Sequence, residues 1–441
     1  MRSAWIKPGE QHPDNHKSTP MISTPRRLNE DWTAVIIGFV IIFLALLLLP
    51  YMPALPMFYG SKEKWMSMDF FHGVFTGSNQ VKLLYLFTFL TAIAFVGSLI
   101  LRRTTWKFIL SFWMIFSLAM VAQMIAAHTS VKSLNIETVF FSVLIGLLIS
   151  NTIKTPGWLK PAIQSEFYIK IGLVLLGTSV LFSNIMKAGA LGLIQALVVV
   201  TAIWYVAFWI ARRYRIDDEM STMLASAVSI CGVSAAIATC GAIKGDSRKL
   251  SYVISLVLIV AIPMMILMPY LAKWMGLSQE VAGAWIGGTI DTTGAVVASG
   301  TIIGETAQKY AVIIKSAQNV LLGIAAFVIS IYWTYSGKGN QAGEKPSARI
   351  IWERFPKFVL GFLLASLLFS VAIGNDLFVK AGSVIKGYQN IWFSIAFVCI
   401  GLETRFSEIF HFDNRKPLVA FLIAQLINIV LTLGIAYLLF H

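Results

Sequence analysis

Residues 280–305 read EVAGAWIGGTIDTTGAVVASGTIIGE, and residues 218–245 read DEMSTMLASAVSICGVSAAIATCGAIKG. Both stretches are rich in Gly, Ala, Ser and Thr, and a lone aspartate, Asp291, lies near the middle of the first. Neither stretch is a clean apolar span of roughly 20 residues, which is the length that crosses a bilayer as a helix. We therefore expect two interrupted or re-entrant membrane segments near residues 218–245 and 280–305.

The rest of the chain is strongly apolar. Of its 441 residues 57% are hydrophobic and only 13% are charged, whereas soluble domains have about 25% charged residues. Further apolar segments lie at about 32–50, 82–101, 108–127, 138–153, 168–186, 189–211, 250–273, 309–334, 357–374, 388–404 and 417–440. The predicted fold class is an all-α polytopic membrane protein with about 11 transmembrane helices, two interrupted or re-entrant segments and inverted repeats.

The basic residues indicate the orientation. The formal net charge is +14, and clusters such as Arg26-Arg27, Arg102-Arg103 and Arg212-Arg213 lie between apolar segments, as the positive-inside rule requires. This places the N-terminus in the cytoplasm and the C-terminus outside, and it explains the charge without nucleic acid. Lys380 and Lys386 are expected in an outside loop. Lys244 and Lys249 lie inside only if the first interrupted segment is re-entrant, and the sequence leaves this open.

Two internal similarities point to inverted repeats. Residues 229–238 (SICGVSAAIA) and 289–298 (TIDTTGAVVA) share the pattern hydroxyl-Ile-x-x-x-small-Ala-x-aliphatic-Ala. Residues 177–185 (GTSVLFSNI) and 401–409 (GLETRFSEI) share Gly, Phe, Ser and Ile in register. The second pair belongs to helices of opposite expected direction. Such repeats with Gly-interrupted segments are typical of secondary transporters with a site at the membrane midplane, although the two pairs do not fit one simple duplication.

An interrupted helix would create an anion site without any catalytic group. The exposed amides of a half-helix N-terminus carry about half a positive charge, and glycine allows the close approach of a ligand. The alternative is close helix packing through small residues. The candidate substrate-binding residues in the two segments are Ser229, Cys231, Gly232, Val233, Ser234, Thr289, Thr292, Thr293 and Gly294.

Two charged residues stand out inside apolar surroundings. A carboxylate such as Asp291 is expensive within a membrane and points to a functional site, here for a coupling proton or Na+. Its alternative role is to cap the following half-helix. Lys315 lies about two turns into an expected helix and shares one face with Gln318 and Asn319, so this stripe is expected to contact an anion or to pair with Asp291.

Other polar residues have simpler interpretations. Glu166 and Glu403 are expected at helix ends, in surface or interfacial pairs. Gln195, Gln425 and Asn428 are expected to form hydrogen bonds between helices. The three cysteines form no C-x-x-C pair, and no Walker A, H-E-x-x-H or G-x-S-x-G motif occurs. Neither an enzyme nor a cofactor is therefore predicted, and ATP-driven transport is disfavoured.

Several separated motifs resemble the YeiH-type sulfate exporter family. They are residues 169–200, Ser229–Gly232, Ile286–Thr289, Ala311–Lys315 and Gly401–Arg405. The resemblance covers about residues 135–440. It implies a bacterial inner-membrane transporter core at 135–441, preceded by a cytoplasmic tail at 1–31 and additional helices at 32–130. An elevator-type motion and a homodimer are usual for such relatives. An arginine that the family has soon after the Lys315 position is Gln318 here, which leaves the substrate and the coupling ion open.

The predicted function is secondary transport of a small anion, such as sulfate, sulfite or an organosulfonate, across the bacterial cytoplasmic membrane by alternating access. Asp291 would hold the coupling proton or Na+, and Lys315 would supply positive charge. Three alternatives stay open: a cation/proton antiporter that uses Asp291, a channel, and a membrane-embedded enzyme or scaffold. Vesicle flux with and without counterflow separates the first two alternatives from the last.

Overall fold

The computed structural model describes residues 29–55, 77–103, 105–129, 131, 138–153, 155–335, 352, 355–404 and 415–441, and within these ranges it contains helices and no strands. The longer helices are α1 (Glu30–Leu47), α3 (Gly77–Ile100), α4 (Phe108–Ala126), α6 (Thr138–Thr152), α7 (Ser165–Leu176), α8 (Phe182–Arg213), α11 (Ser247–Trp274), α14 (Glu305–Tyr335), α16 (Lys357–Val371), α17 (Asp376–Glu403) and α18 (Lys416–Phe440). The shorter ones are α9 (Asp218–Ser226), α10 (Val233–Ile243), α12 (Gln279–Thr289) and α13 (Thr293–Ile303). The predicted all-α class is confirmed.

Eight of the described helices are long and apolar enough to cross a membrane. Their outward faces are apolar as well: on α18, Leu426 is 62% exposed, Val430 is 70% exposed and Leu438 is 83% exposed. Side chains of this kind suit contact with lipid rather than with water. The chain is therefore a multi-pass membrane protein. Helices α6, α7 and α16, which are too short to count among these eight, coincide with three of the remaining predicted spans.

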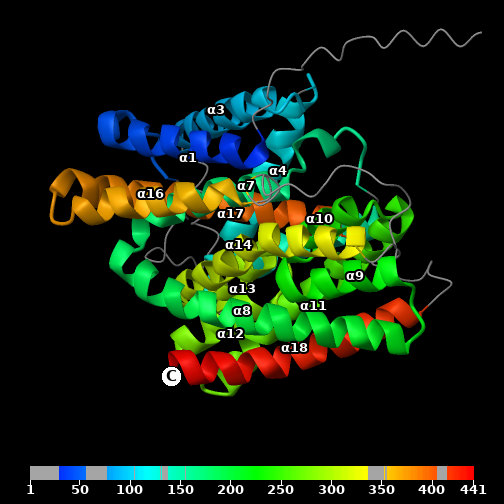
Figure 1. Ribbon diagram of the computed structural model, residues 1–441. Coiled ribbons are helices and arrows are strands. Elements are labelled where there is room, and N and C mark those ends of the chain that lie inside the picture. The colour runs from blue at the N-terminus through cyan, green and yellow to red at the C-terminus, as the bar shows by residue number, and fades with distance from the viewer. Residues whose placement is uncertain are drawn as a thin grey trace, which may run out of the picture.

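The helices form two bundles (Figure 1). The α17 bundle contains α1, α3, α4, α6, α7, α16 and α17, and the α14 bundle contains α8 to α14 and α18. Within the α17 bundle, Tyr168 packs against Trp392 and Phe112 with ring centroids 5.6 and 5.9 Å apart. Only a few helix pairs connect the two bundles, chiefly α13 with α7 and α17, and α8 with α16.

The long helices end at two opposite faces of the molecule. We call the face with Glu30, Arg213, Lys249 and Lys357 the Lys249 end, and the face with the other ends of these helices the Glu305 end. One boundary prediction was wrong, because Lys380 and Lys386 lie within α17 and not in a loop. The first turns of α17 contain lysines and are less apolar than the rest of the helix. The hydropathy pattern therefore places the start of this helix too late in the sequence.

The first interrupted segment is re-entrant. Helix α9 enters from the Lys249 end and continues as a single π-helical turn, Ala227–Cys231. The chain then reverses at Gly232, whose φ of 57° favours glycine, and α10 returns. At the start of α11, Lys249 pairs with Asp217 at 2.7 Å and with Glu219 at 3.1 Å, and both acidic residues lie at the start of α9. The basic residues after α10 therefore lie at the end from which α9 enters.

The second interrupted segment is re-entrant from the Glu305 end. Helix α12 has 11 residues, which span about 16 Å and cannot cross a bilayer. The chain stops being helical over residues 290–292, and α13 returns. Gln279, at the start of α12, accepts a hydrogen bond from the amide of Ala307 at 3.3 Å, just after α13 has ended. The two hairpins thus enter from opposite ends and meet inside the α14 bundle.

Both sequence similarities fit one inverted repeat if its order is permuted. The units α6, α7, α8, α9–α10 and α11 correspond to α16, α17, α18, α12–α13 and α14, each running in the opposite direction. The packing agrees: α6 packs on α17 as α16 packs on α7, α9 packs on α8 as α12 packs on α18, and α10 packs on α14 as α13 packs on α11. The hairpins come fourth in the first repeat and first in the second. Part of the motif at 401–409 lies outside the described residues.

Candidate functional site

The tips of the two hairpins touch in the middle of the α14 bundle. A methyl group added at Gly232 would lie 2.6 Å from Cγ1 of Val257 and 3.1 Å from Cβ of Asp291. No larger residue fits this contact, and the positive φ of Gly232 excludes one for a second reason. The glycine therefore allows the break in the first hairpin to rest directly on the break in the second.

Side chains satisfy the carbonyl groups where the entering helices stop. Lys315 donates through Nζ to the carbonyl of Ile230 at 2.6 Å and to Oε1 of Gln318 at 3.0 Å. Gln318 in turn donates to the carbonyl of Gly288 at 2.9 Å. The Lys315 ammonium thus meets the negative C-terminal end of the first entering segment, where a cation is favourable. It makes no ion pair with Asp291 within the described part of the chain, which corrects that expectation.

Two amides on α18 complete this network. Asn428 donates to the carbonyls of Val228 at 3.2 Å and Thr289 at 3.3 Å, so one side chain joins both hairpin tips. Gln425 donates to the carbonyl of Thr289 at 3.0 Å. These are the hydrogen bonds between helices that the sequence predicts, here directed at interrupted backbone, where an unsatisfied group would cost several kcal/mol.

The N-terminal turns of the two returning helices face a cavity between the bundles. Two adjoining chambers of about 350 and 290 Å3 share Glu30, Glu166, Lys170, Ser234 and Ile237. The first turn of a helix has amides without intrahelical partners and a partial positive charge. In α13 the side chain of Thr292 accepts one of these bonds, from the amide of Ala295 at 3.3 Å. In α10 no side chain caps the first turn. We call this side of the cavity, with Val233 and Ser234 of α10 and Thr293 and Gly294 of α13, the hairpin wall. Its free amides and partial positive charge are suited to an anion.

The facing wall comes chiefly from α1, α7 and α17, and its charged side chains are mostly acidic. Lys170 bridges Glu30 at 2.7 Å and Asp31 at 3.0 Å, and Arg103 also pairs with Glu30 at 2.7 Å. Two of the carboxylates are thereby neutralised. The acidic charge of this wall that has no ion pair among the described residues therefore comes from other side chains.

Glu403 and Glu166 supply that charge. Glu403 accepts a hydrogen bond from the hydroxyl of Ser165 at 2.6 Å. Glu166 is exposed to the cavity and has neither an ion pair nor a hydrogen bond among the described residues. Both are expected in interfacial pairs, and the neighbouring basic residues Lys154 and Arg405 lie outside the described residues, so this stays a prediction. In the sequence, Glu166 and Lys170 are four residues apart, and this spacing indicates a polar face on the helix.

Asp291 lies behind the hairpin wall. Its residue is 1% exposed, and neither carboxylate oxygen has a hydrogen-bond partner among the described residues. The hypothesis that Asp291 caps α13 was wrong, because Thr292 fills that role. A buried carboxylate without a donor is costly, and a proton or a cation is the usual remedy.

The candidate residues therefore divide into two groups. Those that line the cavity are Cys231, Val233, Ser234, Thr292, Thr293, Gly294 and Asn319. Those that are buried behind it are Ser229, Gly232, Thr289, Asp291, Lys315 and Gln318. The hydroxyl of Ser229 donates to the carbonyl of Ala225 at 2.7 Å, a bond within its own hairpin. Within the described ranges no cluster of three His, Cys, Asp or Glu side chains could hold a metal ion.

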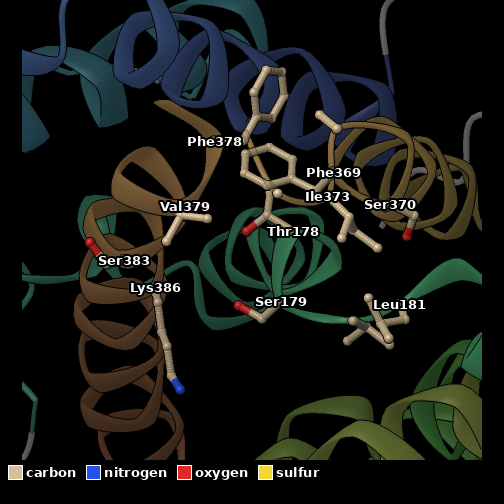
Figure 2. Close-up of a pocket in the computed structure, with 14 residues that line it drawn as sticks. Thr178, Ser179, Leu181, Phe369, Ser370, Ile373, Phe378, Val379, Ser383 and Lys386 are labelled. Carbon is tan, nitrogen blue, oxygen red and sulfur yellow. The ribbon is translucent and has the colours of Figure 1, made fainter. Parts of the chain in front are cut away.

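The Glu305 end has less space between the two bundles. A smaller cavity of about 140 Å3 lies between α17 and the α13–α14 connection, and Lys386 pairs there with Glu305 across the two bundles at 2.6 Å. A neighbouring cavity of about 330 Å3 lies within the α17 bundle. Figure 2 shows Lys386 extending from α17 beside Ser179, and it shows Phe369 and Phe378 next to each other near Thr178. An ion pair thus joins the bundles opposite the large cavity.

Comparison with known proteins identifies relatives for most of the chain. A family model described as conserved hypothetical protein 698 matches residues 110–421. A UPF0324 membrane protein of Rhodopirellula baltica is 40% identical over 347 residues, which are 77% of this chain and 64% of that protein. One of Nitratidesulfovibrio vulgaris is 41% identical over 348 residues, which are 76% of this chain and 60% of that protein. The chain thus aligns with less than two thirds of each of these two relatives. No solved structure matches it.

Proposed function

Since the chain belongs to the family described as conserved hypothetical protein 698, the YeiH family that its motifs resemble, we propose that it is a secondary transporter for a small anion. The substrate class is sulfate, sulfite or a small organosulfonate. The proposed location is the bacterial cytoplasmic membrane, with the Lys249 end in the cytoplasm. Because the chain aligns with only part of each relative, the activity is proposed for this chain alone.

The observation that carries the proposal is the shared position of the N-terminal turns of α10 and α13 on one wall of the cavity. Ser234 and Thr293 add hydroxyl donors to this wall, and Asn319 adds an amide. Half-helix N-termini at the interface of inverted repeats are a recurrent way to bind anionic groups in transporters. A tetrahedral oxyanion offers several acceptors to such a set of donors.

The arrangement of the two bundles supports alternating access as the mechanism. The large cavity lies on the Lys249 side of the hairpin tips, and the Glu305–Lys386 ion pair joins the bundles on the other side. We propose that the α14 bundle slides against the α17 bundle, which breaks this pair and moves the hairpin tips toward the Glu305 end. The inverted repeat provides a second arrangement of equivalent packing. A homodimer held through the α17 bundle is the expected assembly.

Counterflow in liposomes tests the proposal. The purified full chain is reconstituted into vesicles loaded with unlabelled sulfate, sulfite or methanesulfonate, and uptake of the labelled anion is followed. A transporter accumulates label transiently and saturably. The double variant Asp291→Asn, Lys315→Ala is expected to abolish accumulation. Unchanged uptake by this variant would contradict the assigned roles. Large currents without counterflow would indicate a channel, and absence of flux with every solute would indicate a protein that does not transport.

A cation/proton antiporter is the second candidate, because Asp291 is buried without a hydrogen-bond donor. It predicts that a pH jump across Na+-loaded vesicles drives Na+ efflux in the absence of any transported anion. Asp291→Asn would remove that efflux. Anion counterflow that persists without a pH gradient, together with no Na+ efflux, would favour the first candidate.

A further inference from the structure

Four oxygen atoms beside the break in the second hairpin have no partner. They are Oγ1 of Thr289, both carboxylate oxygens of Asp291 and Oε1 of Gln425, and all are buried without a hydrogen bond among the described residues. The three residues are no more than 2% exposed. Buried polar atoms normally find partners, and four acceptors without one in three adjacent side chains call for a specific ligand.

The three side chains lie next to one another at the break in the second hairpin. Thr289 ends α12, Ile290 is extended with φ −73° and ψ 132°, and Asp291 follows, so both side chains lie at the break. Gln425 donates through Nε2 to the carbonyl of Thr289 at 3.0 Å and contacts Sδ of Met264 at 3.2 Å. The side-chain amide of Gln425 therefore lies at the break, and its Oε1 accepts no hydrogen bond among the described residues.

The charges favour a monovalent cation. The cluster has one carboxylate, and its other oxygens are neutral, so a single positive charge balances it. The described residues contain no group of three His, Cys, Asp or Glu of the kind that holds a divalent metal. Lys315 makes no ion pair with Asp291, because its Nζ is bonded to Ile230 and Gln318, so a cation at the carboxylate itself would meet acceptors that have no other partner among the described residues. The cluster also lies at the C-terminal end of α12, where the helix dipole is negative.

We propose that Thr289, Asp291 and Gln425 form a Na+ site, and that Na+ bound there strengthens anion binding at the hairpin wall of the cavity. Hard cations of this kind take oxygen ligands, and in transporters interrupted helices supply such sites. Asp291 directly precedes Thr292, the cap of α13, so an unbalanced carboxylate would oppose an anion at the first turn of that helix. Neutralising it removes this repulsion. The coupling rests on the proposed function, whereas the Na+ site does not.

The site is tested without any transported substrate. The thermal unfolding midpoint of the purified full chain is measured in NaCl, KCl and choline chloride at equal ionic strength and across pH. Na+ is expected to raise the midpoint saturably, because a ligand that binds the folded state stabilises it by mass action. Thr289→Val removes one ligand oxygen and keeps the shape of the side chain, and Asp291→Asn removes the charge. Each variant is expected to lose the Na+ response or to need about tenfold more Na+ for it, which is within the range of typical coupling factors.

Asn428→Ser is the matched control. Asn428 also bonds the hairpin tips, but its Oδ1 already accepts a hydrogen bond from Thr432 at 2.8 Å. This variant is expected to unfold at a lower temperature and to keep the wild-type Na+ response. Equal midpoints in Na+ and choline for the wild-type chain would overturn the site, as would a Na+ response that survives both Thr289→Val and Asp291→Asn. A response to pH alone would mean that Asp291 binds a proton instead.

The coupling is tested separately by measuring sulfite binding with and without Na+. The proposal expects Na+ to tighten sulfite binding about tenfold in the wild-type chain and not in Thr289→Val. Equal sulfite affinity in Na+ and choline, with the Na+ midpoint shift intact, would refute the coupling and leave the Na+ site. Intact anion counterflow without any Na+ response would refute this inference alone and leave the proposed function.

Discussion

The two re-entrant hairpins have the same plan, yet their tips differ chemically. The first, α9–α10, reverses through a π-helical turn and Gly232, and its returning helix has no side-chain cap. The second, α12–α13, reverses through a short extended linker that contains Asp291, and Thr292 caps its returning helix. The first tip thus leaves more free amides toward the cavity, and the second adds a buried carboxylate behind it. We infer that the inverted repeat brings the two tips together, that the first tip chiefly serves anion binding and that the second adds the cation site.

The largest expected effect breaks the contact between the tips. Gly232→Ala places a methyl group against Val257 and Asp291 at a positive φ, and strain and overpacking together should cost about 4 kcal/mol of unfolding free energy. Anion counterflow should fall to background. Both are measured on the purified variant, by denaturant unfolding and by vesicle uptake.

Gly294→Ala is the matched substitution in the second hairpin. A methyl group there meets only the tips of two flexible side chains, at 2.5 Å from Cδ1 of Ile169 and 2.9 Å from Cδ1 of Ile400. Because both isoleucines belong to the α17 bundle, this variant should slow transport with little loss of stability. Equal destabilisation by the two substitutions would mean that the tips are not in the tight contact described.

The second prediction concerns charge rather than shape. Lys315→Met leaves the carbonyl of Ile230 without its donor and removes the cation nearest to Asp291, which should cost about 2 kcal/mol. Adding Asp291→Asn should recover part of this loss, because the double variant no longer buries an unbalanced carboxylate. A double-mutant cycle on unfolding free energies measures the interaction between the two sites. Strict additivity would show that Lys315 serves the first hairpin only.

The sequence predicts the two tips well, because their composition is local: small residues, hydroxyls and one aspartate inside apolar surroundings. It does not predict their partners. Lys315 bonds a carbonyl 85 positions away, and Asn428 reaches Val228 across 200 positions, so neither contact leaves a local pattern. The acidic wall was missed for a related reason. Glu30, Glu166 and Glu403 each lie near a helix end and have the sequence context of interfacial residues, and only the packing of α1, α7 and α17 brings them together.

The third prediction tests the difference in capping. Thr292→Ala removes the side-chain acceptor for the amide of Ala295 and should cost about 1 kcal/mol, whereas Thr292→Ser should keep most of the stability. No equivalent substitution exists in the first hairpin, where Gly232 precedes α10. Unfolding free energies of the two variants give the comparison. If Thr292→Ala were as stable as Thr292→Ser, the cap would contribute nothing and the two tips would be more alike than described.

The smallest expected effect tests which wall of the cavity binds the anion. Glu166→Gln removes a negative charge that lines the cavity opposite the hairpin wall, and it should tighten sulfite binding by about twofold to threefold, since solvent in the cavity screens the interaction. The gain should shrink as salt is raised. Lys170→Gln is the opposite control, because it leaves Glu30 and Asp31 without their shared cation and should weaken binding. If both substitutions changed the sulfite affinity in the same direction, the charge of the facing wall would not act on the anion. Anion binding would then depend on the amides of the hairpin wall alone.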